Sequence, residues 1–173
     1  MTRRIDIDRA DFATRRAAHL KQADSLAWPV DTRAITRIGD TVTLDRNGQG
    51  RPHDGVDLFV PAGTEVVSAA RGTVTAVKDG RFSSGPHLKR AGLFVEVTAP
   101  GKRLYRYLHL GSVAVKEGQH LSPRDLVGVV APAHTSGLGE DPHLHFEVRE
   151  AAKAGEHYGR PINPLMLLPK KRA

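Results

Sequence analysis

The feature that most constrains the fold is a succession of short segments with strand-like alternation, separated by glycine and proline. The chain has 173 residues, of which 17 are glycine and 11 are proline, and these two residues bound nearly every apolar segment. Short strand-like segments separated by such turn residues at regular spacing are typical of antiparallel sheets. The segments expected to form strands are 34–38, 41–44, 55–59, 65–69, 73–78, 93–98, 103–109, 126–131 and 143–149. We therefore expect an all-β fold, an antiparallel β-sandwich or open barrel, with long loops around a groove.

Two of the connecting loops, 79–92 and 132–142, are long and rich in Gly or Pro, and loops of this length in a compact domain are often functional. Residues 1–27 differ from the rest, because Asp8 can cap a helix with a thin apolar stripe. We expect a short N-terminal helical arm over 1–27, one β domain over 28–168 that begins at Trp28, and a basic tail over 169–173.

The composition excludes several classes of protein. Lysine and arginine total 26 against 19 acidic residues, which gives a net charge of +7. This charge favours anionic partners such as acidic cell-wall polymers, although solubility alone explains it about equally well. No aromatic residues interleave with clustered basic ones, so nucleic acid is a weak candidate. The absence of cysteine excludes disulfides, thiolate metal sites and a cysteine nucleophile.

No apolar run is long enough to form a transmembrane segment, and the polar N-terminus lacks the apolar core of a signal peptide. We therefore expect one of three situations: the protein works inside the cell, it is exported by a route that needs no signal peptide, or the sequence has been trimmed.

The segment 143–149 places two histidines side by side. Its alternation puts His143, His145 and Glu147 on one face of a strand and the three intervening apolar residues on the other. The two imidazoles would lie about 7 Å apart at roughly 3.3 Å per residue. One of them could bind a metal while its neighbour handles a proton. Alone, the pair is weak evidence, because a half-exposed strand can carry two histidines by chance.

A second group of candidate ligands lies upstream, where His53 and Asp57 flank Gly55. A straight strand would hold residues four apart at about 13 Å, whereas a turn at Gly55 would bring them together. Zinc accepts imidazole nitrogen and carboxylate oxygen, and three protein ligands with one open position are the catalytic pattern. His53, Asp57 and one histidine of the later pair would complete such a set. His109 shares a face with Tyr105 and Tyr107 by alternation, and taken alone it reads as a structural histidine.

In order and spacing, five motifs of the chain resemble those of the lysostaphin-type (LytM-like) zinc endopeptidases, which cut peptidoglycan peptides. The resemblance covers roughly residues 28–168. The motifs are Trp28-Pro29-Val30, His53-x-Gly55-x-Asp57 with Pro61-x-Gly63-Thr64, Tyr107-Leu108-His109-Leu110, Gly118-Gln119, and His143-Leu144-His145-Phe146-Glu147.

The resemblance implies that His53, Asp57 and His145 bind one zinc ion per chain. It also implies that His143 and His109 are catalytic and flank the open position, with His143 favoured as the general base, although sequence alone does not settle which histidine takes that role. Glu147 is expected either to orient a ligand or to be a surface carboxylate.

Other candidates lie outside this set. Tyr107 and His87 are expected to contact the substrate. His87 follows Gly-Pro as the histidine pair follows Asp-Pro, but Lys89 stands where a ligand would be needed. The remaining histidines are expected to be solvent-facing or structural: His19, His120, His134 and His157. Glu140 and Asp141 stand where the family usually has Ser, Thr or Gly, which bears on substrate preference.

The expected function is therefore zinc-dependent hydrolysis of peptide bonds in bacterial peptidoglycan. Direct D-alanyl–diaminopimelate cross-links are preferred, because enzymes that cut glycine bridges usually bring a separate wall-binding domain. The alternative is a catalytically inactive member that binds a cell-wall amidase or murein. A carrier or sugar-phosphotransfer module is a third possibility, but it would need only one accessible histidine or lysine and not a complete set of ligands. The substrate implies action outside the cytoplasm. One expectation is a secreted antibacterial effector whose residues 1–27 meet a secretion adaptor or immunity protein; a phage-type lytic enzyme or a fragment of a longer protein are others.

Overall fold

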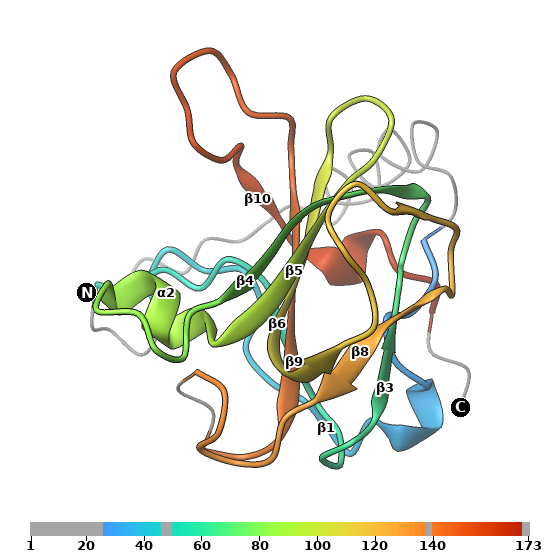
Figure 1. Ribbon diagram of the computed structural model, residues 1–173, viewed down its shortest axis with the longest axis vertical. Helices are drawn as coiled ribbons and strands as arrows, with labels where there is room; N and C mark the ends of the chain where they lie inside the picture. The colour runs from blue at the N-terminus through green and yellow to red at the C-terminus, as the bar shows by residue number, and fades with distance from the viewer. Residues whose placement is uncertain (1–25, 46–49, 138–139, 171–173) are drawn as a thin grey trace, which may run out of the picture.

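The computed structural model describes residues 26–45, 50–137 and 140–170, and these residues form an open antiparallel sheet with very little helix (Figure 1). The ten strands of the described chain are β1 (Arg37–Ile38), β2 (Val56–Phe59), β3 (Glu65–Val67), β4 (Gly72–Asp79), β5 (Leu93–Thr98), β6 (Leu104–Val113), β7 (His120–Leu121), β8 (Leu126–Val130), β9 (His143–Arg149) and β10 (Pro161–Ile162). The helices are η1 (Thr32–Ala34), α2 (Pro86–Ala91) and η3 (Pro164–Met166). The predicted all-β fold is confirmed.

The strands follow the order β1-β2-β9-β6-β5-β4-β7, with β10 against β9 and β3 against β8, which in turn pairs with β6. Strands β9 and β6 occupy the centre, so the histidine-bearing segment is also the most enclosed part of the sheet. A long loop between β9 and β10 projects from one end of β9, and the loop that follows β8 lies at the other end (Figure 1). All seven residues of β9 are buried.

The apolar alternates of β9 explain the burial of one face. Leu144, Phe146 and Val148 have no exposed surface and belong to the main core. The ring of Phe146 lies 6.4 Å from that of Tyr105 and 5.2 Å from that of Tyr107, both on β6. Burial of each such side chain contributes roughly 1.5–3 kcal/mol. This core fixes the register of β9, and so determines which residues its opposite face presents.

Three elements differ from the sequence expectations. The predicted loop 79–92 contains the six-residue helix α2, which begins at Pro86, ends at Ala91 and is followed by the C-cap Gly92 with a φ of 68°. The segment 41–44 forms only one bridge, between Thr43 and His53, and the segment 34–38 is a strand only over β1. Helix η1 takes the residues before β1, because the Asp31 carboxylate caps it. The helical arm was expected over residues 1–27, and residues 1–25 of it lie outside the described part of the chain.

The two ends of the described chain meet. The indole N–H of Trp28 donates to the carbonyl of Pro169 at 3.0 Å. Nearby, Leu26 and Val30 share the core with Leu167 and Leu168. No helix of the described residues is long and apolar enough to cross a membrane.

Candidate metal centre

The candidate site lies on the face of β2, β9 and β6 that is opposite the main core. Residues directly opposite on paired strands project on the same side, so the register builds the site row by row. Asp57 on β2 is opposite His145 on β9, and His145 is opposite Leu108 on β6. In the next row, Phe59 is opposite His143.

Three imidazole nitrogens surround one carboxylate oxygen. Asp57 Oδ1 lies 3.1 Å from His53 Nε2 and 2.8 Å from His145 Nδ1. It also lies 3.8 Å from His143 Nε2. His53, Asp57 and His145 each offer one ligand atom, and these three atoms lie within 4.8 Å of one another, all on buried residues. The structure thus brings together the three residues expected to bind metal.

A bend at Gly55 joins His53 to Asp57, as the sequence predicts. The backbone carbonyl of Thr41 lies 3.0 Å from His53 Nδ1 and accepts a hydrogen bond from it, which directs Nε2 towards Asp57. Glycine is needed at position 55 because a Cβ there would lie 2.8 Å from His145 Nε2 and would overlap the carbonyl oxygen of Phe146. The missing side chain makes the space in which the His145 ring lies.

Glu147 holds the outer nitrogen of His145. Its Oε1 lies 3.3 Å from His145 Nε2, whereas the other ring nitrogen, Nδ1, contacts Asp57. Two guanidinium groups fix this carboxylate: Arg106 Nη1 donates to both oxygens at 2.9 and 3.0 Å, and Arg149 Nε donates at 2.6 Å. Glu147 is only 3% exposed, so it is not a surface carboxylate.

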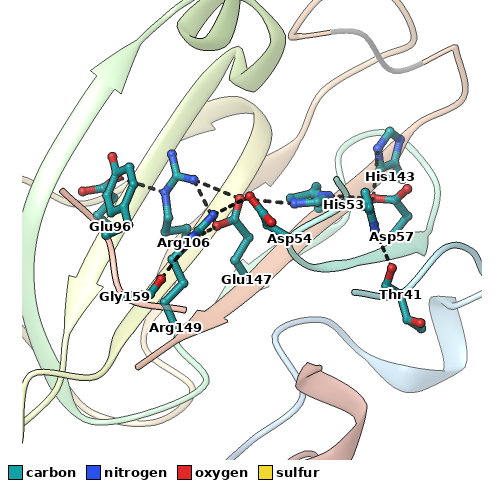
Figure 2. A network of polar contacts seen from close by, with 12 residues as sticks. Thr41, His53, Asp54, Asp57, Glu96, Arg106, His143, Glu147, Arg149 and Gly159 are labelled. Carbon is teal, nitrogen blue, oxygen red and sulfur yellow. Dashed lines mark hydrogen bonds and ion pairs between the residues drawn. The ribbon is translucent and has the colours of Figure 1, made fainter. Parts of the chain in front are cut away.

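The same network extends away from the histidines. Arg106 Nε donates to Glu96 at 2.9 Å, and the Tyr158 hydroxyl donates to the same Glu96 oxygen at 2.8 Å. Arg149 donates to Asp54 at 2.7 Å and to the carbonyl of Gly159 at 3.2 Å. Figure 2 shows this chain of contacts running from Glu96 to the histidines. The loop between β9 and β10 therefore supports the site through Tyr158 and Gly159.

The charges of the central groups follow from these contacts. Burial opposes ionisation of Asp57, but hydrogen bonds with His145 and His53 outweigh it and hold the pKa of Asp57 well below its usual range. Burial alone would lower the pKa of His145, yet its contacts with Asp57 and Glu147 raise that pKa to about 9. Glu147 keeps a pKa well below its usual range, because His145, Arg106 and Arg149 outweigh the effect of burial.

His143 presents one nitrogen to the site. Its Nδ1 lies 2.8 Å from the carbonyl oxygen of Asp141. Since a carbonyl can only accept, Nδ1 carries the proton, and the neutral ring then has a lone pair on Nε2. That Nε2 is the atom 3.8 Å from Asp57 Oδ1. The backbone therefore selects the tautomer that a general base at Nε2 requires.

His109 reaches the site because the strand is irregular there. Strict alternation would place it with Tyr107 in the core, but its φ is 64° and the pairing of β6 with β5 shifts register beside it. Such a bulge re-aims a side chain. The His109 ring consequently lies 4.7 Å from that of His143 and 6.0 Å from that of His145.

The surroundings of His109 are tight. Its Nδ1 is buried and has no hydrogen-bond partner among the described residues. A Cβ at Gly137 would overlap this nitrogen, so the loop that follows β8 packs directly on the ring. Burial lowers the pKa of His109 to about 3, and the neighbouring His143 and His145 act in the same direction. His109 is therefore a neutral imidazole at physiological pH.

Two predicted substrate contacts lie elsewhere. The Tyr107 side chain is fully buried in the core, where its hydroxyl accepts from the N–H of Ala69 at 2.8 Å; we assign it a packing role. His87 is exposed on α2, and the structure gives it no contact with the metal-ligand candidates. The other histidines of the described chain, His120, His134 and His157, are exposed as expected, and His19 lies outside the described residues.

Sequence reasoning missed the groups that hold Glu147. Arg149 could have been found, because alternation places it on the histidine face of β9. Arg106 is opposite Glu147 in the register of β6 and β9, but pairing between strands 41 residues apart is not visible in one sequence. Tyr158 and Glu96 are also contributed by distant segments.

The donor set fits a divalent metal. It combines two imidazole nitrogens with one carboxylate oxygen and contains no thiolate, which is a usual combination for zinc. In each candidate histidine, the ring nitrogen that faces away from Asp57 contacts an oxygen. His53 Nδ1 contacts the carbonyl of Thr41, and His145 Nε2 contacts the carboxylate of Glu147. Metal-binding histidines almost always have such a partner, because it fixes the ring and the tautomer.

The chain is similar to several known proteins. The cell division protein DipM of Caulobacter vibrioides is 30% identical over 144 residues, covering 83% of this chain and 21% of DipM. The peptidoglycan DD-endopeptidase ShyA of Vibrio cholerae is 30% identical over 114 residues, covering 66% of this chain and 22% of ShyA. This chain thus spans about a fifth of the length of these curated relatives.

Among solved structures, a zinc-containing peptidase from Vibrio cholerae superposes with a TM-score of 0.63 at 27% identity, covering 84% of this chain and 41% of that one. The catalytic domain of lysostaphin from Staphylococcus simulans superposes with a TM-score of 0.60 at 21% identity, covering 75% and 89%, and supports the fold. The sequence profile of Peptidase family M23 matches residues 51–164, which include all the histidines and carboxylates of the site. The chain belongs to peptidase family M23.

Proposed function

We propose that this protein is a zinc-dependent endopeptidase that hydrolyses peptide bonds in bacterial peptidoglycan. This proposal rests on one observation. Ring nitrogens of His53, His145 and His143 converge on one oxygen of Asp57, and His109 lies beside them. His53, Asp57 and His145 are the proposed ligands of one zinc ion. When bound, zinc would supply a Lewis acid for the scissile carbonyl and lower the pKa of a water molecule towards 7.

The remaining histidines have complementary proposed roles. His143 accepts the proton of the attacking water at Nε2, because Nδ1 already donates to Asp141. It then passes that proton to the departing amine. His109 remains a neutral imidazole with one N–H, which can donate to the negative charge that develops on the carbonyl oxygen. Glu147 acts only through His145, whose outer nitrogen it holds.

Peptidoglycan as the substrate is supported by family membership and by the name of a relative, the peptidoglycan DD-endopeptidase ShyA. We propose direct D-alanyl–diaminopimelate cross-links as the bonds that are cut. This substrate implies action outside the cytoplasm. The domain limits of 28–168, the antibacterial-effector role and a partner for residues 1–27 stay predictions from the sequence.

The inactive alternative, a member that only binds an amidase or murein, would not need a complete set of ligands and proton carriers. All five of the predicted metal-binding and catalytic side chains are present and close together. We therefore place the enzyme first.

The test is digestion of purified sacculi, followed by mass spectrometry of the released fragments. We expect zinc-loaded protein to release muropeptides cut at D-alanyl–diaminopimelate links, and a chelator to stop the release. His143→Gln should lower the rate by roughly 10²–10⁴-fold, the usual contribution of a general base, while zinc content is unchanged. Release of no fragments by protein that holds one zinc per chain would support the binding alternative.

A further inference from the structure

The row that contains Phe59 and His143 continues towards the edge of the sheet. Arg37 on β1 is directly opposite Phe59 on β2, and Phe59 is directly opposite His143 on β9. Directly opposite residues project on the same side of a sheet. Arg37 therefore belongs with Phe59 to the face that carries the candidate catalytic histidines, although it is not one of the proposed ligands or proton carriers.

These three side chains are stacked. The guanidinium carbon of Arg37 lies 3.5 Å from the centre of the Phe59 ring, which is a cation–π contact. On its other flank, the Phe59 ring stacks with His143 at 5.1 Å between centres and 29° between planes. Position 39 confines the ring, because a Cβ at Gly39 would come within 2.6 Å of its edge. The cation is thus held one aromatic ring away from the proposed general base.

Within the described residues, the ionic contact that the guanidinium of Arg37 makes is a long one. Among the described residues its ionic contact is with Asp141, at 3.8 Å, which is too long for a hydrogen bond. The Arg37 side chain is 58% exposed and that of Asp141 is 71% exposed. Arg106 and Arg149 differ sharply, because both are buried and donate to carboxylates at 2.6–3.0 Å. Arg37 consequently has hydrogen-bond donors to offer to a ligand.

We propose that Arg37 is a subsite for a carboxylate of the peptide substrate, which the planar guanidinium would bind through two parallel hydrogen bonds. This inference rests on the proposed function and narrows its substrate class. Arg37 stands two strands from His143, roughly 10 Å at about 4.8 Å per strand, so the carboxylate belongs near the scissile bond. Stem peptides with free carboxylates meet this requirement, whereas an uninterrupted glycine bridge has no carboxylate there.

Asp141 gives the subsite an internal competitor. Its carboxylate lies 3.8 Å from the guanidinium, and its carbonyl accepts a hydrogen bond from Nδ1 of His143. A substrate carboxylate would take over the ionic contact of the side chain, while the backbone contact would remain. Asp141→Asn removes the competing charge without touching the carbonyl, so it should strengthen discrimination for the acidic substrate.

The test uses zinc-loaded protein and two forms of one cross-linked D-alanyl–diaminopimelate peptide, with all carboxylates free or all converted to carboxamides. We expect wild type to cleave the acid form with the higher kcat/KM. Arg37→Gln should lower kcat/KM on the acid form about tenfold, the scale of one charge-assisted contact at a partly exposed site, and leave the amide form unchanged. Arg37→Lys should retain part of the preference.

Arg160→Gln is the matched control. Arg160 is also an exposed arginine in an ion pair, with Glu150 at 3.1 Å. It adjoins the Arg149 end of β9, roughly 20 Å from His143 at about 3.3 Å per residue. Its loss tests whether overall positive charge produces the preference, and we expect no change in the ratio of the two substrates.

The outcomes separate the two proposals. The carboxylate subsite is overturned if wild type cleaves the acid and amide forms equally, or if Arg37→Gln lowers kcat/KM equally on both forms. Either result leaves the proposed endopeptidase activity unaffected. An effect of Arg160→Gln as large as that of Arg37→Gln also overturns the subsite. Failure of zinc-loaded wild type to cleave either peptide and sacculi overturns the proposed function, and the subsite with it.

Discussion

At the scale of single residues, the site depends on backbone positions as much as on its ligands. Gly55 leaves room for the His145 ring, and Gly137 leaves room for His109. His109 itself has a φ of 64°, a conformation that a residue with a side chain adopts at a cost of about 1–3 kcal/mol. Strain of this kind persists where neighbouring packing enforces it, and here it turns the ring away from the core.

The first prediction concerns Gly55. In Gly55→Ala, the new Cβ would meet His145 Nε2 and the carbonyl oxygen of Phe146. We expect the affinity for zinc, measured by competition with a chromophoric chelator, to fall at least about tenfold, as it does when partners that orient a ligand are disturbed. Gly85→Ala is the control, because its Cβ would make only an ordinary 3.4 Å contact with Ser83. Equal zinc affinities for Gly55→Ala and wild type would contradict this assignment.

At the scale of elements, β9 separates two kinds of environment across one strand. Its apolar alternates complete the core, and its other alternates form a row of His143, His145, Glu147 and Arg149, all buried. Burying ionised groups is costly unless they are paired and hydrogen-bonded. The guanidinium groups of Arg106 and Arg149 provide that pairing for Glu147.

The second prediction concerns acid stability. Because the pKa of Glu147 is held below its usual value, the stability that it contributes is present above about pH 4.5 and is lost as the pH falls below that value. Between pH 5.5 and 3.5, His145 is protonated in both folded and unfolded chains and adds no slope. We expect the free energy of unfolding of zinc-free protein to fall in this window by at least about 1 kcal/mol more in wild type than in Glu147→Gln.

Urea unfolding at the two pH values measures this difference directly. Parallel losses in wild type and Glu147→Gln would show that other carboxylates govern the acid response. Glu117→Gln is a suitable control, since Glu117 is an exposed carboxylate that accepts a hydrogen bond from the N–H of Val77. It should keep the wild-type slope.

Alternation predicted much of this element correctly and failed where the backbone is irregular. The faces of β9 and the bend at Gly55 follow from residue types and local spacing, so they were predictable. The position of His109 was not, since one bulge reverses the face that alternation assigns. The helix α2 was missed because its six residues carry no apolar periodicity. The partners of Glu147 were missed because they depend on strand pairing.

At the scale of the whole molecule, the ends of the described chain close on each other beside the core. Trp28 bonds to Pro169, and Leu26 packs in the same core as Leu168. Leu26, which precedes Trp28, thus contributes to the same core. Residues from both ends of the described chain contribute to one folding unit.

The third prediction follows from this closure. Trp28→Phe removes the hydrogen bond to the Pro169 carbonyl, and we expect a loss of about 1 kcal/mol in the free energy of unfolding, the usual net value of one such bond. Phe82→Leu is the control, because Phe82 is 89% exposed and should change stability by less than about 0.5 kcal/mol. Equal stabilities of Trp28→Phe and wild type would mean that the contact between the ends does not stabilise the fold.

We propose that His53, Asp57 and His145 together bind one zinc ion and that His143 does not bind it. Zinc content per folded chain, measured by mass spectrometry after dialysis against trace zinc, tests it most directly. We predict one zinc for wild type and for His143→Gln, and close to none for His53→Ala, Asp57→Ala and His145→Ala, with circular dichroism confirming that each variant is folded. A folded His145→Ala that retains its zinc, or a His143→Gln that loses it, would show that the three ligands are wrongly assigned.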